Sequence, residues 1–237
     1  MAAKRSGIGR WLCAIAVLLG VAAGRAAPAA SAPVDVELVL AVDCSGSIDN
    51  QEFALQIRGY ASALTHPSVI RAIQSGGIGA IAVTYVQWSG PFIQNQAVGW
   101  TLINDAKSAE EFAAAMLAAR RRIFGGGTSL SGIIDYVRPL FGTGGFEGAR
   151  RTIDISGDGI NNSGRAPTDA RDEAVRGGLT INGLPILTDF ASLDSYFKEN
   201  VIGGPGAFVI PVESFESFAA AILNKLIREI AEAPTER

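Results

Sequence analysis

The sequence contains few cysteines, and their positions leave no pair for a disulfide in the folded domain. Only Cys13 and Cys44 occur in the 237 residues. Cys13 lies in the apolar core of an N-terminal segment that we expect to be removed. Cys44 would then be the single cysteine of the mature chain, which excludes an intrachain disulfide. A domain of roughly 200 residues buries enough apolar surface to fold without one.

The sequence also lacks an excess of positive charge and a second long apolar run. Its formal net charge is −3, and loss of residues 1–26 would remove four basic residues and no acidic one, which changes the charge to −7. A mildly acidic chain of this kind is not expected to bind nucleic acid. Without an apolar run beyond the N-terminus, we expect no membrane span in the mature chain.

The N-terminus has the three parts of a signal peptide. Lys4 and Arg5 give it a positive start, Trp11–Ala23 is almost wholly apolar, and an alanine-rich stretch follows. The apolar part is shorter than the ~20 residues of a membrane-spanning helix. We therefore expect a signal peptide over residues 1–26, cleaved between 26 and 32, with an uncleaved N-terminal anchor as the alternative.

Apolar, β-branched runs alternate with amphipathic segments along the rest of the chain. This alternation predicts an α/β fold with three layers: a mostly parallel central sheet, helices on both faces and one antiparallel edge strand. The sequence has no internal repeat and no linker long enough to split the domain. The expected strands are 36–42, 78–88, 92–102 (the edge strand), 151–156, 179–187 and 207–212. The first expected helix begins at residue 49 or 50. The other expected helices span 67–74, 108–122, 130–140, 168–176, 193–200 and 215–230.

Three polar loops, residues 43–47, 125–129 and 156–162, are expected at one edge of this sheet. In such sheets the binding site lies beyond the carboxyl ends of the strands. The first loop reads D-C-S-G-S, the second places a threonine after three glycines, and the third contains S-G-D-G. Together the loops carry five side chains with oxygen donors: Asp43, Ser45, Ser47, Thr128 and Asp158.

Oxygen donors of this kind suit a hard divalent cation. Mg²⁺ is the first choice, with Mn²⁺ or Ca²⁺ as alternatives. Two carboxylates and three neutral hydroxyls neutralise a dication incompletely, and the weak hydroxyl ligands leave it electrophilic toward an outside anion. The composition of the loops therefore predicts a metal that binds a partner's acidic group rather than a buried structural ion.

Each loop residue also has an ordinary structural interpretation. Residues 43–47 could form a turn that caps the next helix, and Asp158 could be a turn residue. Thr128 could be a helix N-cap, in which case Ser129 would be the alternative ligand. The glycine run 125–127 lacks the G-K-[ST] ending of a phosphate-binding loop, which argues against nucleotide binding.

Other polar residues have structural interpretations as well. Asp154 lies inside an apolar strand, so we expect its carboxyl group to be buried and paired with Arg151 or with a helix terminus. Cys44 is expected to be a small buried side chain rather than a ligand or a reactive thiol. His66 is expected to cap a helix or lie on the surface, and the apolar stripe from Phe215 to Ile230 is expected to be core.

The D-C-S-G-S loop resembles the D-x-S-x-S signature of von Willebrand factor A domains. Their metal-ion-dependent adhesion site (MIDAS) adds a threonine and an aspartate from two later loops, and Thr128 and Asp158 stand at those positions. The resemblance implies a VWFA-like domain over residues 34–233. It also implies direct ligation by Ser45, Ser47 and Thr128, with one or both aspartates acting through water.

Two further segments narrow the resemblance. R-T-I-D-I-S-G-D-G-I-N-N (151–162) and N-V-I-G-G-P-G-A-F-V (200–209) resemble the DUF1194 family. This is a bacterial von Willebrand A-like family without an established activity. The resemblance therefore implies the fold, and with the signal peptide it implies a periplasmic or secreted bacterial protein, but it implies no reaction.

These observations predict an exported, metal-dependent protein-binding module that is not an enzyme. The cation would coordinate an Asp or Glu carboxylate of a partner protein. One alternative is a structural or assembly domain of the cell envelope that does not use a metal. The other is a subtilisin-like hydrolase built from Asp43, His66 and Ser129, against which His66 counts because it lacks the glycine context of such triads.

Overall fold

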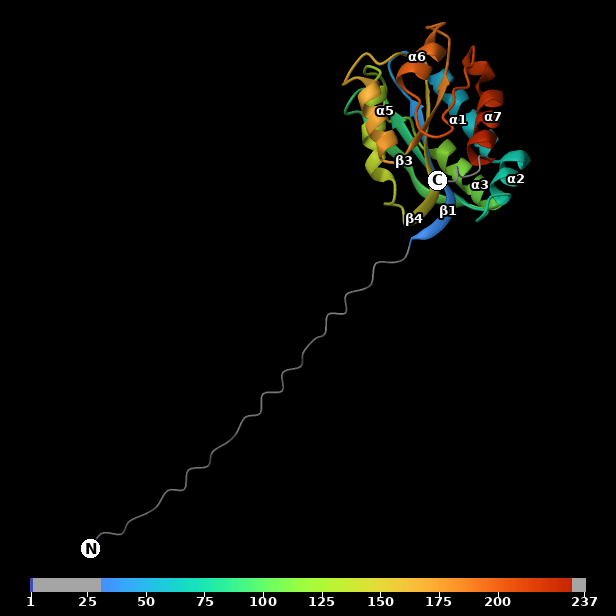
Figure 1. Ribbon diagram of the computed structural model, residues 1–237. Coiled ribbons are helices and arrows are strands. Elements are labelled where there is room, and N and C mark those ends of the chain that lie inside the picture. Colours follow the sequence, from blue (N-terminus) through green and yellow to red (C-terminus); the bar gives the residue numbers. More distant parts are fainter. Residues whose placement is uncertain (2–30, 232–237) are drawn as a thin grey trace.

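The fold is a five-stranded sheet between two layers of helices (Figure 1). The computed structural model describes Met1 and residues 31–231, so the expected signal peptide lies outside the described residues. The strand order is β3-β2-β1-β4-β5, and only β3 runs antiparallel, at one edge. The strands are β1 (Ala32–Asp43), β2 (Ile81–Trp88), β3 (Gln94–Ile103), β4 (Phe146–Gly157) and β5 (Thr180–Pro185). The predicted fold class is confirmed.

The seven α-helices of the described residues cover both faces of the sheet. They are α1 (Asn50–Leu64), α2 (Pro67–Gln74), α3 (Ala106–Ala118), α4 (Leu130–Val137), α5 (Pro167–Arg176), α6 (Leu193–Asn200) and α7 (Phe218–Ala231). Short 3-10 turns, η1 (Arg138–Leu140) and η2 (Phe215–Ser217), adjoin α4 and α7. Within residues 31–231 no helix has the length and apolar character needed to cross a membrane.

The central strand β1 distributes its side chains to two hydrophobic cores. Successive residues of a strand point to opposite faces. Leu38 and Leu40 pack with α1, α2, α3 and α7, whereas Val39 and Ala41 pack with α4, α5 and α6. In Figure 1, α5 lies on one side of the sheet and α1 and α7 lie on the other. Because β1 is buried on both faces, its carboxyl end is held firmly at the middle of one sheet edge.

Local signals set several helix boundaries as predicted. Asp49 is the N-cap of α1, and Glu52 completes a capping box with it. His66 caps α2 through Nδ1, which accepts a hydrogen bond from the backbone N–H of Ser68, and Pro67 occupies the first turn. The predicted role of His66 as a capping residue is confirmed.

The predicted start and end of α3 are wrong. The helix begins at Ala106, because the carboxylate of Asp105 accepts a hydrogen bond from the backbone N–H of Ser108 at 2.7 Å. Ser108 is therefore inside the first turn rather than the cap. The helix ends at Ala118, and Ala119 is extended. The arginines that follow belong to a segment that leads without regular structure into the glycine loop.

Two other expectations are also wrong. The strand expected at 151–156 begins earlier, at Phe146, because β1 extends back to Ala32 and offers Phe146 a partner strand. Residues 207–212, expected as the last strand, form only isolated bridges with β5 and the residue after it. Pro211 has no N–H to donate, so this segment cannot continue a regular ladder.

Candidate metal centre

The first loop turns sharply at the end of β1 and brings its hydroxyls together. The carboxylate of Asp43 accepts a hydrogen bond from the backbone N–H of Ser45 at 2.7 Å, which closes an Asx-type turn. The hydroxyl oxygens of Ser45 and Ser47 then lie 3.3 Å apart. Asp43 and Ser45 are buried, whereas Ser47 is exposed, so the loop opens to solvent at Ser47.

The third loop meets the first directly. Strands β1 and β4 are parallel neighbours, so their carboxyl ends lie side by side. The hydroxyl of Ser47 donates to Oδ1 of Asp158 at 2.9 Å. A Cβ at Gly157 would lie 2.9 Å from Oδ2 of Asp43, which leaves no room for a side chain there. The two carboxylates predicted as ligands therefore face the same small volume.

The second loop joins this arrangement through two hydrogen bonds between Thr128 and Asn162. The backbone N–H of Thr128 donates to the side-chain oxygen of Asn162, and the N–H of Asn162 donates to the carbonyl of Thr128, both at 2.9 Å. A Cβ at Gly159 would lie 3.2 Å from the hydroxyl oxygen of Thr128. The Thr128 hydroxyl thus stands beside the residue that follows Asp158.

Ser129, rather than Thr128, caps the helix after the glycine loop. Its hydroxyl accepts a hydrogen bond from the N–H of Gly132 at 3.1 Å and donates to the carbonyl of Ser163 at 2.9 Å. These contacts occupy Ser129, and they leave Thr128 as the hydroxyl that lines the cleft. The structure brings all five predicted side chains to one place at the carboxyl edge.

Both carboxyl groups are harder to ionise here than in water. Burial, together with the charge of Asp158, raises the pKa of Asp43 to about 7. Burial is also the main cause that raises the pKa of Asp158. Among the described residues no lysine or arginine forms an ion pair with either carboxylate. The site therefore holds two acidic groups that no basic side chain of the described residues contacts directly.

The donor set fits a hard divalent cation. Oδ2 of Asp43 is buried and has no hydrogen-bond partner, although buried polar atoms nearly always have one. It lies beside Gly157 and belongs to the loop that also carries the hydroxyls of Ser45 and Ser47. Within the described residues no group of three or more His, Cys, Asp or Glu side chains has a metal-binding arrangement. Most of the candidate donors here are instead hydroxyls, which suit Mg²⁺-like ions.

Three of the five donors, Ser47, Thr128 and Asp158, line a cleft of about 300 Å³, and its far wall was not predicted. Asp189 and Phe190 contribute to it from the loop after β5. A strand was expected at 179–187, and the loop after a parallel strand lies at the carboxyl edge of the sheet. This position could have identified Asp189 and Phe190 as candidate cleft residues. The remaining lining residues are Gly46, Ser47, Gly126, Thr128, Asp158, Gly159, Ile160 and Asn162.

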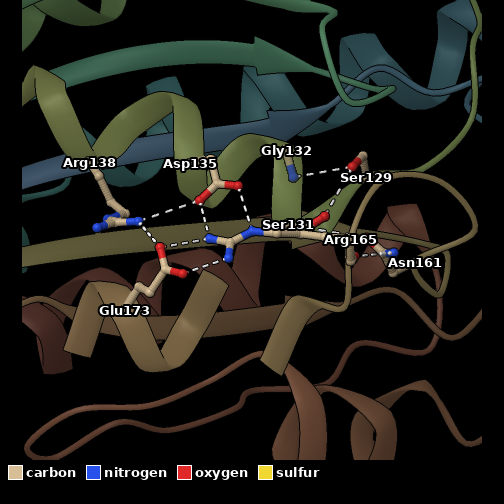
Figure 2. Close-up of polar contacts among 8 residues, drawn as sticks. All are labelled: Ser129, Ser131, Gly132, Asp135, Arg138, Asn161, Arg165 and Glu173. Atoms are coloured by element: carbon tan, nitrogen blue, oxygen red, sulfur yellow. Dashed lines mark hydrogen bonds and ion pairs between the residues drawn. The ribbon is translucent and has the colours of Figure 1, made fainter. Parts of the chain in front are cut away.

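An arginine clamp behind the cleft holds the third loop in place (Figure 2). Arg165 donates to both carboxylate oxygens of Asp135 on α4, at 2.6 and 2.9 Å. It also donates to both oxygens of Glu173 on α5, at 2.7 and 2.9 Å. Arg138 donates to Glu173 as well, at 2.7 Å. Hydrogen bonds from Arg165 and Arg138 lower the pKa of Glu173 to about 2.

The buried charge at Asp154 does not belong to this site. Its predicted pairing with Arg151 is wrong, because Arg151 pairs with Glu37 at 3.5 Å. Asp154 instead pairs with Lys225 of α7 at 2.6 Å. A helix packed over the sheet supplies the positive charge, so no local pattern around Asp154 predicted it.

Cys44 and His66 lie where the structural interpretations placed them. Cys44 is fully buried, and burial raises the pKa of its thiol, which disfavours the reactive thiolate. His66 follows the 15-residue helix α1, which leads away from the metal loop. A helix of that length spans about 22 Å. The geometry therefore does not bring His66 to Asp43 and Ser129.

Comparisons with known proteins agree with this fold. A family model described as "Protein of unknown function (DUF1194)" matches residues 33–234. None of the curated protein sequences matches the chain. Among solved structures, proximal thread matrix protein 1 from the mussel byssus is similar, with 18% identity and a TM-score of 0.64 over 86% of this chain and 49% of that chain. This chain thus spans about half the length of the byssus protein.

Two more solved structures support the same comparison. The byssus protein is also known with a zinc-occupied MIDAS motif; that structure is 17% identical, with a TM-score of 0.59 over 86% of this chain and 50% of that one. The von Willebrand factor domain of the type V pili tip protein Mfa5 from Porphyromonas gingivalis is 12% identical, with a TM-score of 0.58 over 88% of this chain and 98% of that one. At these identities the likeness establishes a shared von Willebrand factor A fold.

Proposed function

Since the chain belongs to the DUF1194 family and has the von Willebrand factor A fold, we propose that it is an exported, metal-dependent protein-binding module. The observation that carries the proposal is the convergence of five oxygen-bearing side chains from three loops, with one carboxylate oxygen of Asp43 buried and unpartnered. A zinc-occupied MIDAS in a protein of the same fold supports it. Adhesin and pilus-tip domains among the structures of this fold support a protein partner.

The candidate ligands are Asp43, Ser45, Ser47, Thr128 and Asp158, and a divalent cation, with Mg²⁺ favoured, is the group they would hold. When bound, the ion supplies a positive centre that attracts an Asp or Glu carboxylate of the partner. The N–H of Ser45 orients the Asp43 carboxylate, and Asn162 orients the backbone of Thr128. Ser47, the exposed member of the set, lies nearest to an approaching partner.

We also propose that the protein is exported from the cytoplasm and that it is not an enzyme. The predicted signal peptide at residues 1–26 supports export to the periplasm or beyond. The chain's only histidine caps α2 at a distance from the cleft, which counts against a serine-hydrolase mechanism. A structural envelope domain that does not use a metal is the second candidate, and the experiment below distinguishes it from the first.

Thermal unfolding in chelator and in excess Mg²⁺ tests the metal site. We expect the melting temperature of the wild type to rise by several degrees in Mg²⁺, because a ligand at 100 times its Kd stabilises the folded state by about 2.7 kcal/mol. Asp43→Asn removes one charged donor while keeping the shape of the side chain, so its melting temperature should not respond. Mn²⁺ and Ca²⁺ titrations rank the ions.

Asp172→Asn is the matched control, because Asp172 is an exposed carboxylate on α5 that pairs with Arg171. It should respond to Mg²⁺ as the wild type does. An equal response of the wild type and Asp43→Asn would overturn the metal site and favour the structural-domain alternative. Capture of partner proteins by the wild type and by Ser47→Ala, each with and without chelator, then tests metal-dependent binding.

A further inference from the structure

Three phenylalanines of the described residues are exposed, and all three lie on loops. They are Phe92, Phe124 and Phe190, with exposures of 96%, 72% and 43%. Ile93 and Ile160 are exposed beside them, at 43% and 37%. A soluble protein seldom gathers large apolar side chains on one surface unless that surface binds something. We call these five residues the apolar rim.

Four residues of the apolar rim adjoin the metal cleft, and Phe92, beside Ile93, lines a neighbouring pocket with residues of α4. Phe190 and Ile160 are part of the cleft wall. The guanidinium of Arg121 lies 5.3 Å from the ring centre of Phe124 and donates to the carbonyls of Cys44 and Ile48, so Phe124 stands beside the metal loop.

The other side of the rim comes from the turn after β2. A Cβ at Gly126, itself a cleft residue, would lie 3.2 Å from the side chain of Ile93. The order of the strands places Phe92 and Ile93 on the β2 side of the metal loop and Ile160 and Phe190 on the β4–β5 side. Apolar side chains therefore flank the polar cleft on both sides.

Positive charge adjoins this surface. Arg120 and Arg122 are exposed in the segment before Phe124. Gln87, at the carboxyl end of β2, holds the segment at this edge by donating to the carbonyl of Arg120 and accepting from the N–H of Arg122. Basic side chains beside the cleft favour an acidic partner and speed its approach.

We infer that the site recognises a polypeptide segment in which an Asp or Glu is flanked on both sides by large apolar side chains. The acidic group would enter the cleft, and the flanking side chains would pack on the apolar rim. This inference rests on the proposed function and adds the sequence preference of the partner. A lipid surface fits less well, because it would bury the carboxylates of Asp158 and Asp189 together with the rim, at a high cost in free energy.

A displayed library of random twelve-residue peptides with a fixed central Glu tests the inference. It is selected on the full-length protein in Mg²⁺, beside a second library with a central Gln. We expect enrichment of Phe, Leu, Ile or Trp next to the Glu, and no enrichment from the Gln library or in chelator. Phe124→Ser combined with Phe190→Ser should lower the affinity of the selected peptides at least about ten-fold, since aromatic side chains dominate such interfaces.

The variants and controls separate this inference from the proposed function. The double variant should keep the Mg²⁺-induced rise in melting temperature, because neither phenylalanine is a candidate ligand. Ile78→Ser, which removes an apolar side chain with 48% exposure before β2, should bind the peptides like the wild type. Glu-dependent peptides without apolar enrichment would overturn the inference alone. A protein that responds to Mg²⁺ but selects no Glu-dependent peptide would overturn the proposed function as well.

Two other occupants of the apolar rim are also tested. Phosphatidylglycerol vesicles that bind the wild type in chelator, but not the double variant, would overturn the inference in favour of a membrane surface. Sedimentation that shows a wild-type dimer, absent in the double variant, would overturn it in favour of a second copy of this chain. We expect neither result.

Discussion

At the scale of single residues, Lys225 is the most unusual side chain of the described chain. It is fully buried, and its ammonium group contacts Asp154 at 2.6 Å and Glu229 at 2.5 Å. The side-chain amide of Asn182 donates to the same oxygen of Glu229 at 3.0 Å. One positive charge thus meets two buried carboxyl groups, so full ionisation of both would leave a net negative charge buried.

The first prediction concerns pH. Burial, followed by the charge of Asp154, raises the pKa of Glu229 to about 7 from an ordinary value near 4.5. Between these values the folded protein holds a proton that the unfolded chain has released, so the free energy of unfolding falls as the pH rises through this window. In chelator, we expect the wild type to be less stable at pH 8 than at pH 5 by about 2 kcal/mol.

Glu229→Gln should remove much of this pH dependence, because the amide cannot ionise while Lys225 keeps its pair with Asp154. Chemical denaturation at the two pH values measures the difference, and Asp43, whose pKa is also raised, accounts for a remaining slope. Glu111→Gln, an exposed acid on α3, serves as the control. A variant that loses as much stability as the wild type between pH 5 and pH 8 would contradict this account.

At the scale of elements, the loop that carries Asp158 depends on two helices. Arg165 ends this loop and bridges α4 to α5 (Figure 2). Asn161 adds a second link, since its side chain accepts from the N–H of Ser131 on α4 and donates to the carbonyl of Arg165. The helices therefore fix the backbone from which Asp158 reaches the cleft, although none of the clamp residues is itself a candidate ligand.

We predict that Arg165→Ala weakens Mg²⁺ binding roughly ten-fold, which is typical when a supporting contact behind a metal ligand is lost. Arg165→Lys keeps the charge but cannot fork onto two carboxylates, so its affinity should be intermediate. Isothermal titration calorimetry measures both variants. Arg171→Ala, from a neighbouring surface pair on α5, should bind Mg²⁺ normally. Unchanged affinity in Arg165→Ala would show that the loop holds its shape without the clamp.

At the scale of the whole molecule, one edge of the sheet carries the candidate site and the opposite edge carries a stabilising contact. The candidate site occupies the carboxyl edge. At the amino edge, the carboxylate of Asp35 accepts hydrogen bonds from three successive backbone N–H groups, of Ile78, Gly79 and Ala80, at 2.8 to 3.3 Å. This cap joins the start of β1 to the start of β2 and lies at the opposite end of the strands from Asp158.

The separation predicts opposite effects of two aspartate variants. Asp35→Ala should lower the free energy of unfolding by about 1–3 kcal/mol, because it leaves backbone donors without their partner. Its melting temperature should still rise in Mg²⁺. Asp158→Asn should keep its stability in chelator and lose the Mg²⁺ response. Denaturation with and without Mg²⁺ gives both quantities, and a loss of the Mg²⁺ response in Asp35→Ala would show that the two edges are coupled.

Local patterns were sufficient for most elements and for the grouping of the candidate ligands. The apolar alternation that makes β1, the cap at Asp49 and the proline at residue 67 act over a few residues, so the sequence alone predicted them. The D-x-S-x-S loop and its partners Thr128 and Asp158 follow strand ends and a glycine run. Their meeting at one edge follows from the parallel sheet that the alternation of elements predicts.

Contacts between distant segments were decided only by the tertiary structure. Lys225 finds Asp154 because α7 packs over β4, and Phe190 and Asp189 reach the cleft because β5 lies next to β4. Residues 207–212 are different, because β5 is present as a partner but Pro211 has no N–H for a regular ladder. Sequence patterns report what a segment prefers by itself, whereas burial, charge pairing and the apolar rim depend on which segments become neighbours.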